Sequence, residues 1–187
     1  MNLPASVEGR ESVRLFYALR LPDETVARLV DWQRTAFAAA SECRVVVPEN
    51  LHVTVAFLGS RPAEELPSLL AALPETSAAV AGELELTVSR YRETRSVGML
   101  VFDDLEGRVA ALAERVHARL EELRAYRREA RAWLPHVTVV RFRRAPRLRP
   151  SLPDLGPVNP SDLALYHSVL RPTGAQYHVL DSVALGG

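Results

Sequence analysis

The chain has 187 residues, of which 48% are hydrophobic and 25% are charged, a composition typical of one large globular domain or two small lobes. No apolar run reaches the roughly 20 residues of a transmembrane helix, and residues 1–12 lack the apolar core of a signal peptide. Cys43 is the only cysteine, which excludes an internal disulfide and a cysteine-rich zinc site. We therefore expect a cytoplasmic protein with a flexible tail over 1–12 and one domain over 13–187.

All basic residues are arginine, and the 23 of them balance 23 acidic residues. The absence of lysine excludes P-loop enzymes and ligases that form a covalent lysyl-nucleotide. Nine arginines lie within 124–149, where Glu129 is the only acidic residue. Guanidinium groups bind phosphate well, although a solvated basic face is the simpler interpretation of such a run.

Apolar periodicity predicts the elements of the first half of the chain. A strand over 13–19 precedes a helix over 26–37, and a strand over 44–47 precedes another that contains His52. A short helix follows over 63–73, with Pro67 in its first turn. Strands over 83–89 and 97–102 lead into the second half.

The second half repeats this order. A helix over 109–123 precedes a strand that contains His136, and an arginine- and proline-rich loop covers 143–160. Strands over 163–170 and 177–185 form a closing antiparallel pair, joined by the turn Pro172–Thr173–Gly174.

An internal repeat organises these elements. The segment His52-Val53-Thr54-Val55 recurs 84 residues later as His136-Val137-Thr138-Val139, and an apolar run begins 39 residues before each histidine. We infer a strand–helix–strand unit used twice, with copies around 13–60 and 97–142. The predicted fold is α+β and bilobal, with two antiparallel sheets, helices on their outer faces and a central cleft.

Side-chain alternation along a strand predicts where the motif residues lie. His52 and Thr54 face one way, whereas the apolar residues that follow, including Val55 and Phe57, face the other way, toward the helices of their lobe. The second motif has the same pattern. Both histidine–threonine pairs are therefore expected to meet in the cleft between the lobes.

Two imidazoles and two hydroxyls in one cleft suit phosphodiester cleavage without a metal. One neutral ring can take a proton from water while a protonated ring gives one to the departing oxygen. Threonine hydroxyls can stabilise the charge that develops on the phosphoryl oxygens. A metal site is the less favoured alternative, because no acidic residue lies next to either motif to complete a ligand set. His117 is interpreted as a helix-surface residue, and His167 and His178 as packing residues of the last two strands.

A resemblance to a known family covers nearly the whole chain. It is clearest in two segments, Pro48-Glu49-Asn50-Leu51-His52 to Phe57-Leu58-Gly59 and Leu134-Pro135-His136 to Arg141. The chain resembles the two-histidine phosphoesterases, in particular the RNA 2′,3′-cyclic phosphodiesterase or 2′-5′ RNA ligase branch. The resemblance implies opening of an RNA 2′,3′-cyclic phosphate to a 2′-phosphate without a cofactor. His52 is then the proton donor to the 3′-oxygen, His136 the base, and Thr54 and Thr138 the phosphate binders. Some members also join RNA ends through a 2′-5′ linkage.

The resemblance also marks three further residues. Arg141 matches an arginine that the family often has three residues after the second threonine, but strict alternation would turn it away from the cleft unless the strand bends. Phe16 is a candidate for substrate contact. Trp133 either stacks on a base or packs at the lobe interface, and packing is slightly favoured.

Two alternatives to RNA hydrolysis stay open. The first is a non-catalytic nucleotide- or RNA-binding module, against which the retention of two titrating rings argues. The second is a phosphodiesterase for small cyclic nucleotides or for ADP-ribose 1″,2″-cyclic phosphate, against which the arginine-rich segment argues. We expect a monomer that acts on RNA, with tRNA-derived 2′,3′-cyclic ends as the expected substrate and no membrane partner.

Overall fold

The computed structural model describes residues 7–78, 82–172 and 174–185. Its strands and helices follow the predicted order closely: β1 (Ser12–Arg20), α1 (Asp23–Ala36), β2 (Arg44–Val45), β3 (His52–Pro62), α2 (Leu66–Ser77), β4 (Thr87–Glu93), β5 (Val97–Asp103), α3 (Arg108–Glu122), β6 (His136–Arg141), β7 (Asp162–Arg171) and β8 (Gly174–Ala184). Short 3₁₀ turns cover Pro48–Asn50 and Ala63–Glu65. No helix among these residues is long and apolar enough to cross a bilayer.

Most predicted boundaries differ from the structure by a few residues, and the following differences have a structural reason or concern the termini. The strand predicted over 83–89 starts only at Thr87, because Leu86 forms an isolated bridge with Val158 instead of joining the ladder. The strand predicted over 44–47 covers only Arg44–Val45, although the N–H of Val46 still donates to the Val139 carbonyl of β6 at 3.0 Å. Of the predicted tail, residues 1–6 lie outside the described residues, and Val7 is buried in the core. Thr173 of the predicted turn is also outside the described residues.

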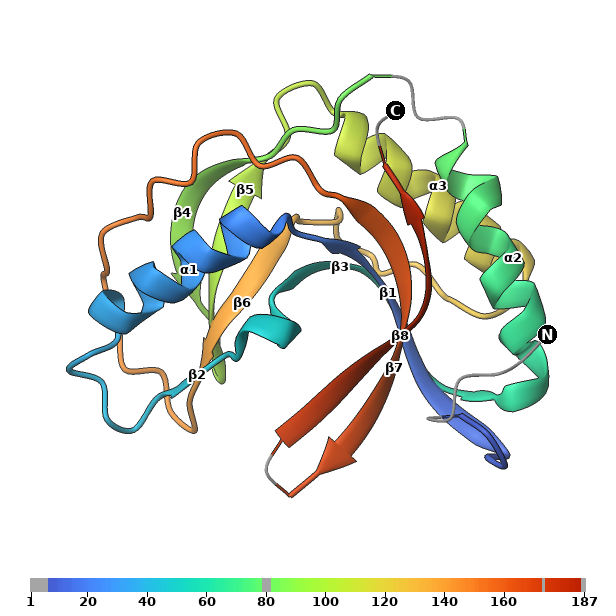
Figure 1. The fold of residues 1–187 in the computed structure, drawn as a ribbon, viewed down its shortest axis with the longest axis horizontal. Coiled ribbons are helices and arrows are strands. Elements are labelled where there is room, and N and C mark those ends of the chain that lie inside the picture. Colours follow the sequence, from blue (N-terminus) through green and yellow to red (C-terminus); the bar gives the residue numbers. More distant parts are fainter. Residues whose placement is uncertain (1–6, 79–81, 173, 186–187) are drawn as a thin grey trace.

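The strands form a single curled antiparallel sheet in the order β4-β5-β6-β3-β1-β7-β8, with β2 pairing with β6 (Figure 1). The α+β class and the antiparallel pairing are confirmed. The two predicted sheets are halves of this one sheet, joined where Val53 of β3 pairs with Val137 of β6. The strands that carry the two motifs are therefore the central pair.

The helices cross over between the halves (Figure 1). Helix α1 follows β1 in the sequence, yet it covers the half that contains β4, β5 and β6. Phe37, which ends α1, contacts Tyr91 of β4 with ring centroids 6.2 Å apart. Helices α2 and α3 cover the other half, where Tyr17 of β1 donates a hydrogen bond to the Leu69 carbonyl of α2. The expectation that each helix covers the sheet of its own repeat copy is wrong, because β2 at the far end of α1 pairs with β6.

A β-bulge follows the threonine of each motif. The ladder between β6 and β5 skips Val139, and the ladder between β3 and β1 skips Val55. A bulge adds one residue to a strand and so reverses which face the following side chains occupy. Beyond this point, both strands therefore depart from simple alternation.

A buried side chain from a helix binds the carbonyl of each bulged residue. Gln33 of α1 donates from Nε2 to the Val139 carbonyl at 2.8 Å, and His117 of α3 donates from Nε2 to the Val55 carbonyl at 2.9 Å. Gln33 and His117 are separated by the same 84 residues as the two motifs. The interpretation of His117 as a surface residue is wrong: only 2% of it is exposed, because its ring satisfies a carbonyl inside the core.

Replacing His117 tests this role in stability. His117→Leu leaves the Val55 carbonyl without its donor, and we expect the free energy of unfolding to fall by about 1–3 kcal/mol, the cost of an unsatisfied buried polar group. His117→Gln should cost less, because glutamine performs the equivalent role at residue 33. Urea unfolding followed by circular dichroism measures both. Equal losses for the two variants would contradict the role of this hydrogen bond.

Candidate functional site in the central cleft

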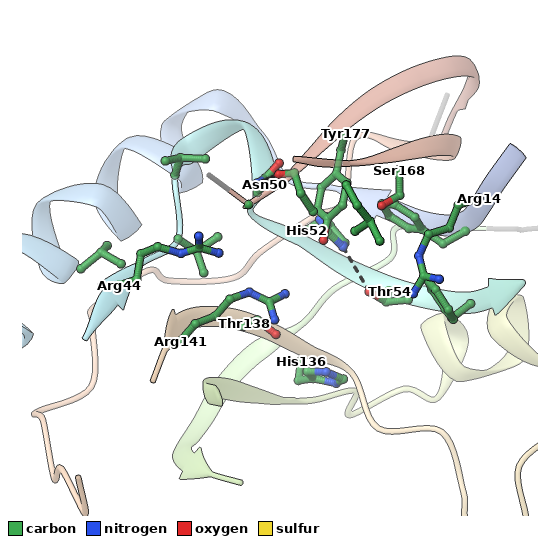
Figure 2. Close-up of a pocket in the computed structure, with 18 residues that line it drawn as sticks. Arg14, Arg44, Asn50, His52, Thr54, His136, Thr138, Arg141, Ser168 and Tyr177 are labelled. Carbon is green, nitrogen blue, oxygen red and sulfur yellow. Dashed lines mark hydrogen bonds between the residues drawn. The ribbon is translucent and has the colours of Figure 1, made fainter. Parts of the chain in front are cut away.

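The two motifs meet in a cleft of about 650 Å³ (Figure 2). His52 and Thr54 line it from β3, and His136 and Thr138 line it from β6. The four residues singled out by the repeat are thus brought together, as predicted from alternation and duplication. Ser168 of β7 and Tyr177 of β8 add polar groups from the C-terminal hairpin.

Aromatic rings surround His52. Its ring centroid lies 5.0 Å from that of Phe16, 5.7 Å from that of Tyr166 and 5.5 Å from that of Tyr177. Its Nε2 is 3.1 Å from Thr54 Oγ1, within hydrogen-bond distance. Phe16, predicted as a substrate contact, lines the cleft as one wall of this aromatic cluster.

The aromatic surroundings keep the His52 ring neutral. The pKa of His52 is lowered from 6.5 to about 4, chiefly by burial, with smaller contributions from the charges of His136 and Arg141. The carbonyl of Asn50 partly offsets this effect, although no well-aligned hydrogen bond satisfies His52 Nδ1. At pH 7 the free protein therefore holds His52 without its second proton.

His136 is oriented by its own backbone. Its Nδ1 lies 2.8 Å from the carbonyl of Leu134, to which it donates. This hydrogen bond fixes the tautomer, so the lone pair of the neutral ring is on Nε2. A ring held in this way can exchange a proton through Nε2 without having to reorient.

Arg141 lines the cleft beside Thr138 (Figure 2). Simple alternation would have placed it on the opposite face, but the bulge at Val139 shifts the alternation by one residue. Val139 and Val140 are consequently both buried, and Arg141 emerges on the cleft side. The family-based expectation for Arg141 agrees with this placement.

The same shift acts on Phe57 in β3. We expected Phe57 to face the helices, and this is wrong: it lines the cleft and is 49% exposed, because the bulge at Val55 turns it around. The guanidinium of Arg14 lies 4.5 Å from the centre of the Phe57 ring. Arg14 also lines the cleft, near Thr54 in Figure 2, whereas Arg44 lies on the side of Arg141.

Trp133 is a packing residue in this structure. Its indole Nε1 donates to the carbonyl of Thr54 at 3.0 Å, and its ring packs against the core. It is not among the residues that line the cleft. This placement agrees with packing rather than with stacking on a base. The indole links the segment before β6 to the motif of β3.

Several lining residues were missed from the sequence, namely Arg14, Arg44, Asn50, Ser168 and Tyr166 of the adjoining aromatic cluster. Tyr166 and Ser168 are two residues apart on β7, so strand alternation could have put them on one face. No group of three or more histidine, cysteine or acidic side chains that could hold a metal occurs within 7–78, 82–172 and 174–185.

Comparisons with known proteins agree with this geometry. A family model described as LigT like Phosphoesterase matches residues 19–93. The RNA 2′,3′-cyclic phosphodiesterase of Thermus thermophilus is 37% identical over 185 residues, which cover 94% of this chain and 91% of the relative. The RNA 2′,3′-cyclic phosphodiesterase of Escherichia coli is 42% identical over 55 residues, 29% of this chain and 31% of that protein.

Solved structures share the fold. A crystal structure of a Thermus thermophilus protein superimposes with a TM-score of 0.74 at 33% identity, over 92% of this chain and 97% of that one. Escherichia coli LigT complexed with phosphate has a TM-score of 0.75 at 23% identity, over 95% of this chain and 100% of that one. With a relative aligned along nearly its whole length and the two motifs in one cleft, the chain belongs to the LigT-like phosphoesterase family.

Proposed function

We propose that this protein hydrolyses 2′,3′-cyclic phosphate ends of RNA to 2′-phosphomonoesters without a metal. The observation that carries the proposal is the meeting of two histidine–threonine pairs in one cleft, with Arg141 beside them. The Thermus thermophilus relative, named as an RNA 2′,3′-cyclic phosphodiesterase, supports the same reaction.

The reaction needs one proton removed and one supplied. In the proposed mechanism, His136 Nε2 takes a proton from water as the water oxygen attacks phosphorus. The bond between phosphorus and the 3′-oxygen breaks, and His52 Nε2 donates a proton to that oxygen. A 2′-phosphate and a 3′-hydroxyl result, and the two imidazoles have exchanged protonation states.

Charge that develops on the non-bridging oxygens is met by the remaining cleft residues. The hydroxyls of Thr54 and Thr138 donate hydrogen bonds to these oxygens, and the Arg141 guanidinium supplies a positive charge. With a ribose 5′-hydroxyl in place of water, the same attack would give a 2′-5′ linkage, so reversible ligation is part of the proposal. A tRNA-derived substrate, a monomeric state and a cytoplasmic location stay predictions.

The donor role of His52 depends on the substrate. Because burial among aromatic rings holds its pKa at about 4, His52 of the free protein at pH 7 lacks the second proton that makes it an imidazolium donor. An anionic phosphate next to the ring favours the charged imidazolium and raises the pKa. Substrate binding and protonation of His52 are therefore coupled in this mechanism.

Removing either histidine should abolish hydrolysis. We expect wild-type protein to convert an oligoribonucleotide ending in 2′,3′-cyclic phosphate to the 2′-phosphate in the presence of EDTA. His52→Ala and His136→Ala should each lower kcat by about 10²- to 10⁴-fold, the usual contribution of a general acid or base. Chromatography of the products and phosphorus NMR identify the position of the phosphate.

The matched control is His178→Ala, which removes an exposed histidine of β8 outside the cleft. It should retain wild-type activity. An inert wild type, or full activity in either cleft variant, would refute the proposed reaction, and loss of wild-type activity in EDTA would refute metal independence.

The protonation of His52 can be followed directly by NMR. In the free protein, its ring should titrate near pH 4 and be neutral at pH 7. Saturation with a nucleoside 2′-monophosphate, the product class, should raise the pKa toward or above 6.5, because the phosphate dianion stabilises the imidazolium. A pKa that stays near 4 in the complex would mean that His52 is the base and His136 the donor.

A further inference from the structure

A second hollow, of about 400 Å³, adjoins the cleft at Phe57. It is lined by Phe57, Leu58, Arg61, Arg124, Ala125, Tyr126, Arg127 and Glu129. Phe57 is the residue that the two hollows share. We call the second one the arginine hollow. A chain that leaves the cleft past Thr54 can therefore cross the exposed Phe57 ring and enter the arginine hollow.

Buried and paired groups hold the walls of the arginine hollow. Arg61 binds Glu65 through Nε and Nη2 and also donates from Nη2 to the carbonyl of Arg124 at 3.3 Å. Tyr126 stacks on the buried His117 ring with centroids 5.0 Å apart. The segment that follows α3 is thus held to β3 through Arg61 and to α3 through His117.

Two arginines of the hollow are without an anionic partner. Within the described part of the chain, the side chains of Arg124 and Arg127 make no ion pair or hydrogen bond, and both residues are exposed. Nearby, Arg128 pairs with Glu114 and Glu121, and Arg131 pairs with Glu129. The basic segment noted in the sequence therefore contains two kinds of arginine. Some are paired with a carboxylate, and others have no ion pair and can bind an anion.

Arg124 also occupies an uncommon backbone position. Its φ of 55° lies in the left-handed region, directly after α3, at a position that is most often glycine when it has this conformation. The chain has an arginine at a position whose backbone conformation glycine would adopt more easily. The backbone conformation and the unpaired charge thus coincide on one residue of the hollow.

We propose that the arginine hollow binds the phosphates of the RNA that precede the cyclic end, which makes a polynucleotide rather than a mononucleotide the preferred substrate. This inference rests on the proposed function. Arg124 and Arg127 hold backbone phosphates through their planar guanidinium groups. Phe57, with Arg14 on its ring, supplies a surface between cleft and hollow on which a base stacks, a combination typical of single-strand binding.

The test compares a long and a short substrate. In the double variant Arg124→Gln/Arg127→Gln, kcat/KM for a hexaribonucleotide ending in 2′,3′-cyclic phosphate should fall roughly tenfold, because two charge-assisted contacts are lost. The value for 2′,3′-cyclic AMP, which fills only the cleft, should stay within about twofold of wild type, because it makes neither contact. The slope of log kcat/KM against log salt for the hexamer should become shallower by about 1.4, at about 0.7 per phosphate contact.

The matched control is Arg128→Gln/Arg131→Gln, which removes the same charge from arginines that are already paired. An equal loss in this control, or an equal loss on 2′,3′-cyclic AMP, would overturn the inference. Unchanged hexamer kinetics in the Arg124/Arg127 variant, with an active wild type, would overturn it while leaving the proposed function intact.

Binding gives a readout that does not depend on turnover. Fluorescence anisotropy of a 5′-labelled hexaribonucleotide ending in a 2′-phosphate should show a roughly tenfold higher Kd for the double variant. The single variant Arg127→Gln, at an exposed site, should show part of this effect if the double variant is poorly folded. An unchanged Kd in both variants would overturn the inference, even if the wild type proved inert on the cyclic substrates.

Discussion

The structure depends on two hydrogen bonds that hold an extra residue in each central strand. Val55 and Val139 bulge out of their ladders, and their carbonyls lie inside the core, where an unpaired oxygen is costly. The Val139 carbonyl also accepts from the backbone N–H of Val46 at 3.0 Å. His117 and Gln33 donate to these carbonyls. Each bulge reverses the alternation of the side chains that follow it. The two hydrogen bonds that support the bulges therefore help to turn Phe57 and Arg141 into the cleft.

The crossing of the helices gives these contacts a second effect. Gln33 comes from the first repeat copy but binds the strand of the second, and His117 does the reverse. Each bulge is therefore supported by the opposite copy, and the halves of the sheet interlock. The direct pairing of β3 with β6 is limited to Val53 and Val137, so the helices and their buried polar side chains add much of the connection between the two motifs.

Much of this could be predicted from the sequence, because the evidence was local or repeated. The duplicated motif identified both histidine–threonine pairs, and the apolar periodicity placed nearly all elements within a few residues. The bulges could not be predicted, since Val-Thr-Val-Val has the apolar pattern of an ordinary strand. His117 lies at the spacing of the buried stripe of α3, four residues after Ala113 and three before Leu120, but its polar side chain makes a surface position the simpler interpretation. The aromatic enclosure of His52 depends on a hairpin more than a hundred residues away in the sequence.

That enclosure makes the two halves of the cleft unequal. A duplicated cleft with perfect twofold symmetry would accept a cyclic phosphate in two equivalent poses, related by exchange of the histidines. Phe16, Tyr166 and Tyr177 contact His52, whereas no aromatic ring among the described residues contacts His136. The aromatic rings therefore form a flat, apolar wall only on the His52 side of the cleft. The repeat thus places a histidine on each side of the cleft, and the aromatic wall beside His52 makes the two poses inequivalent.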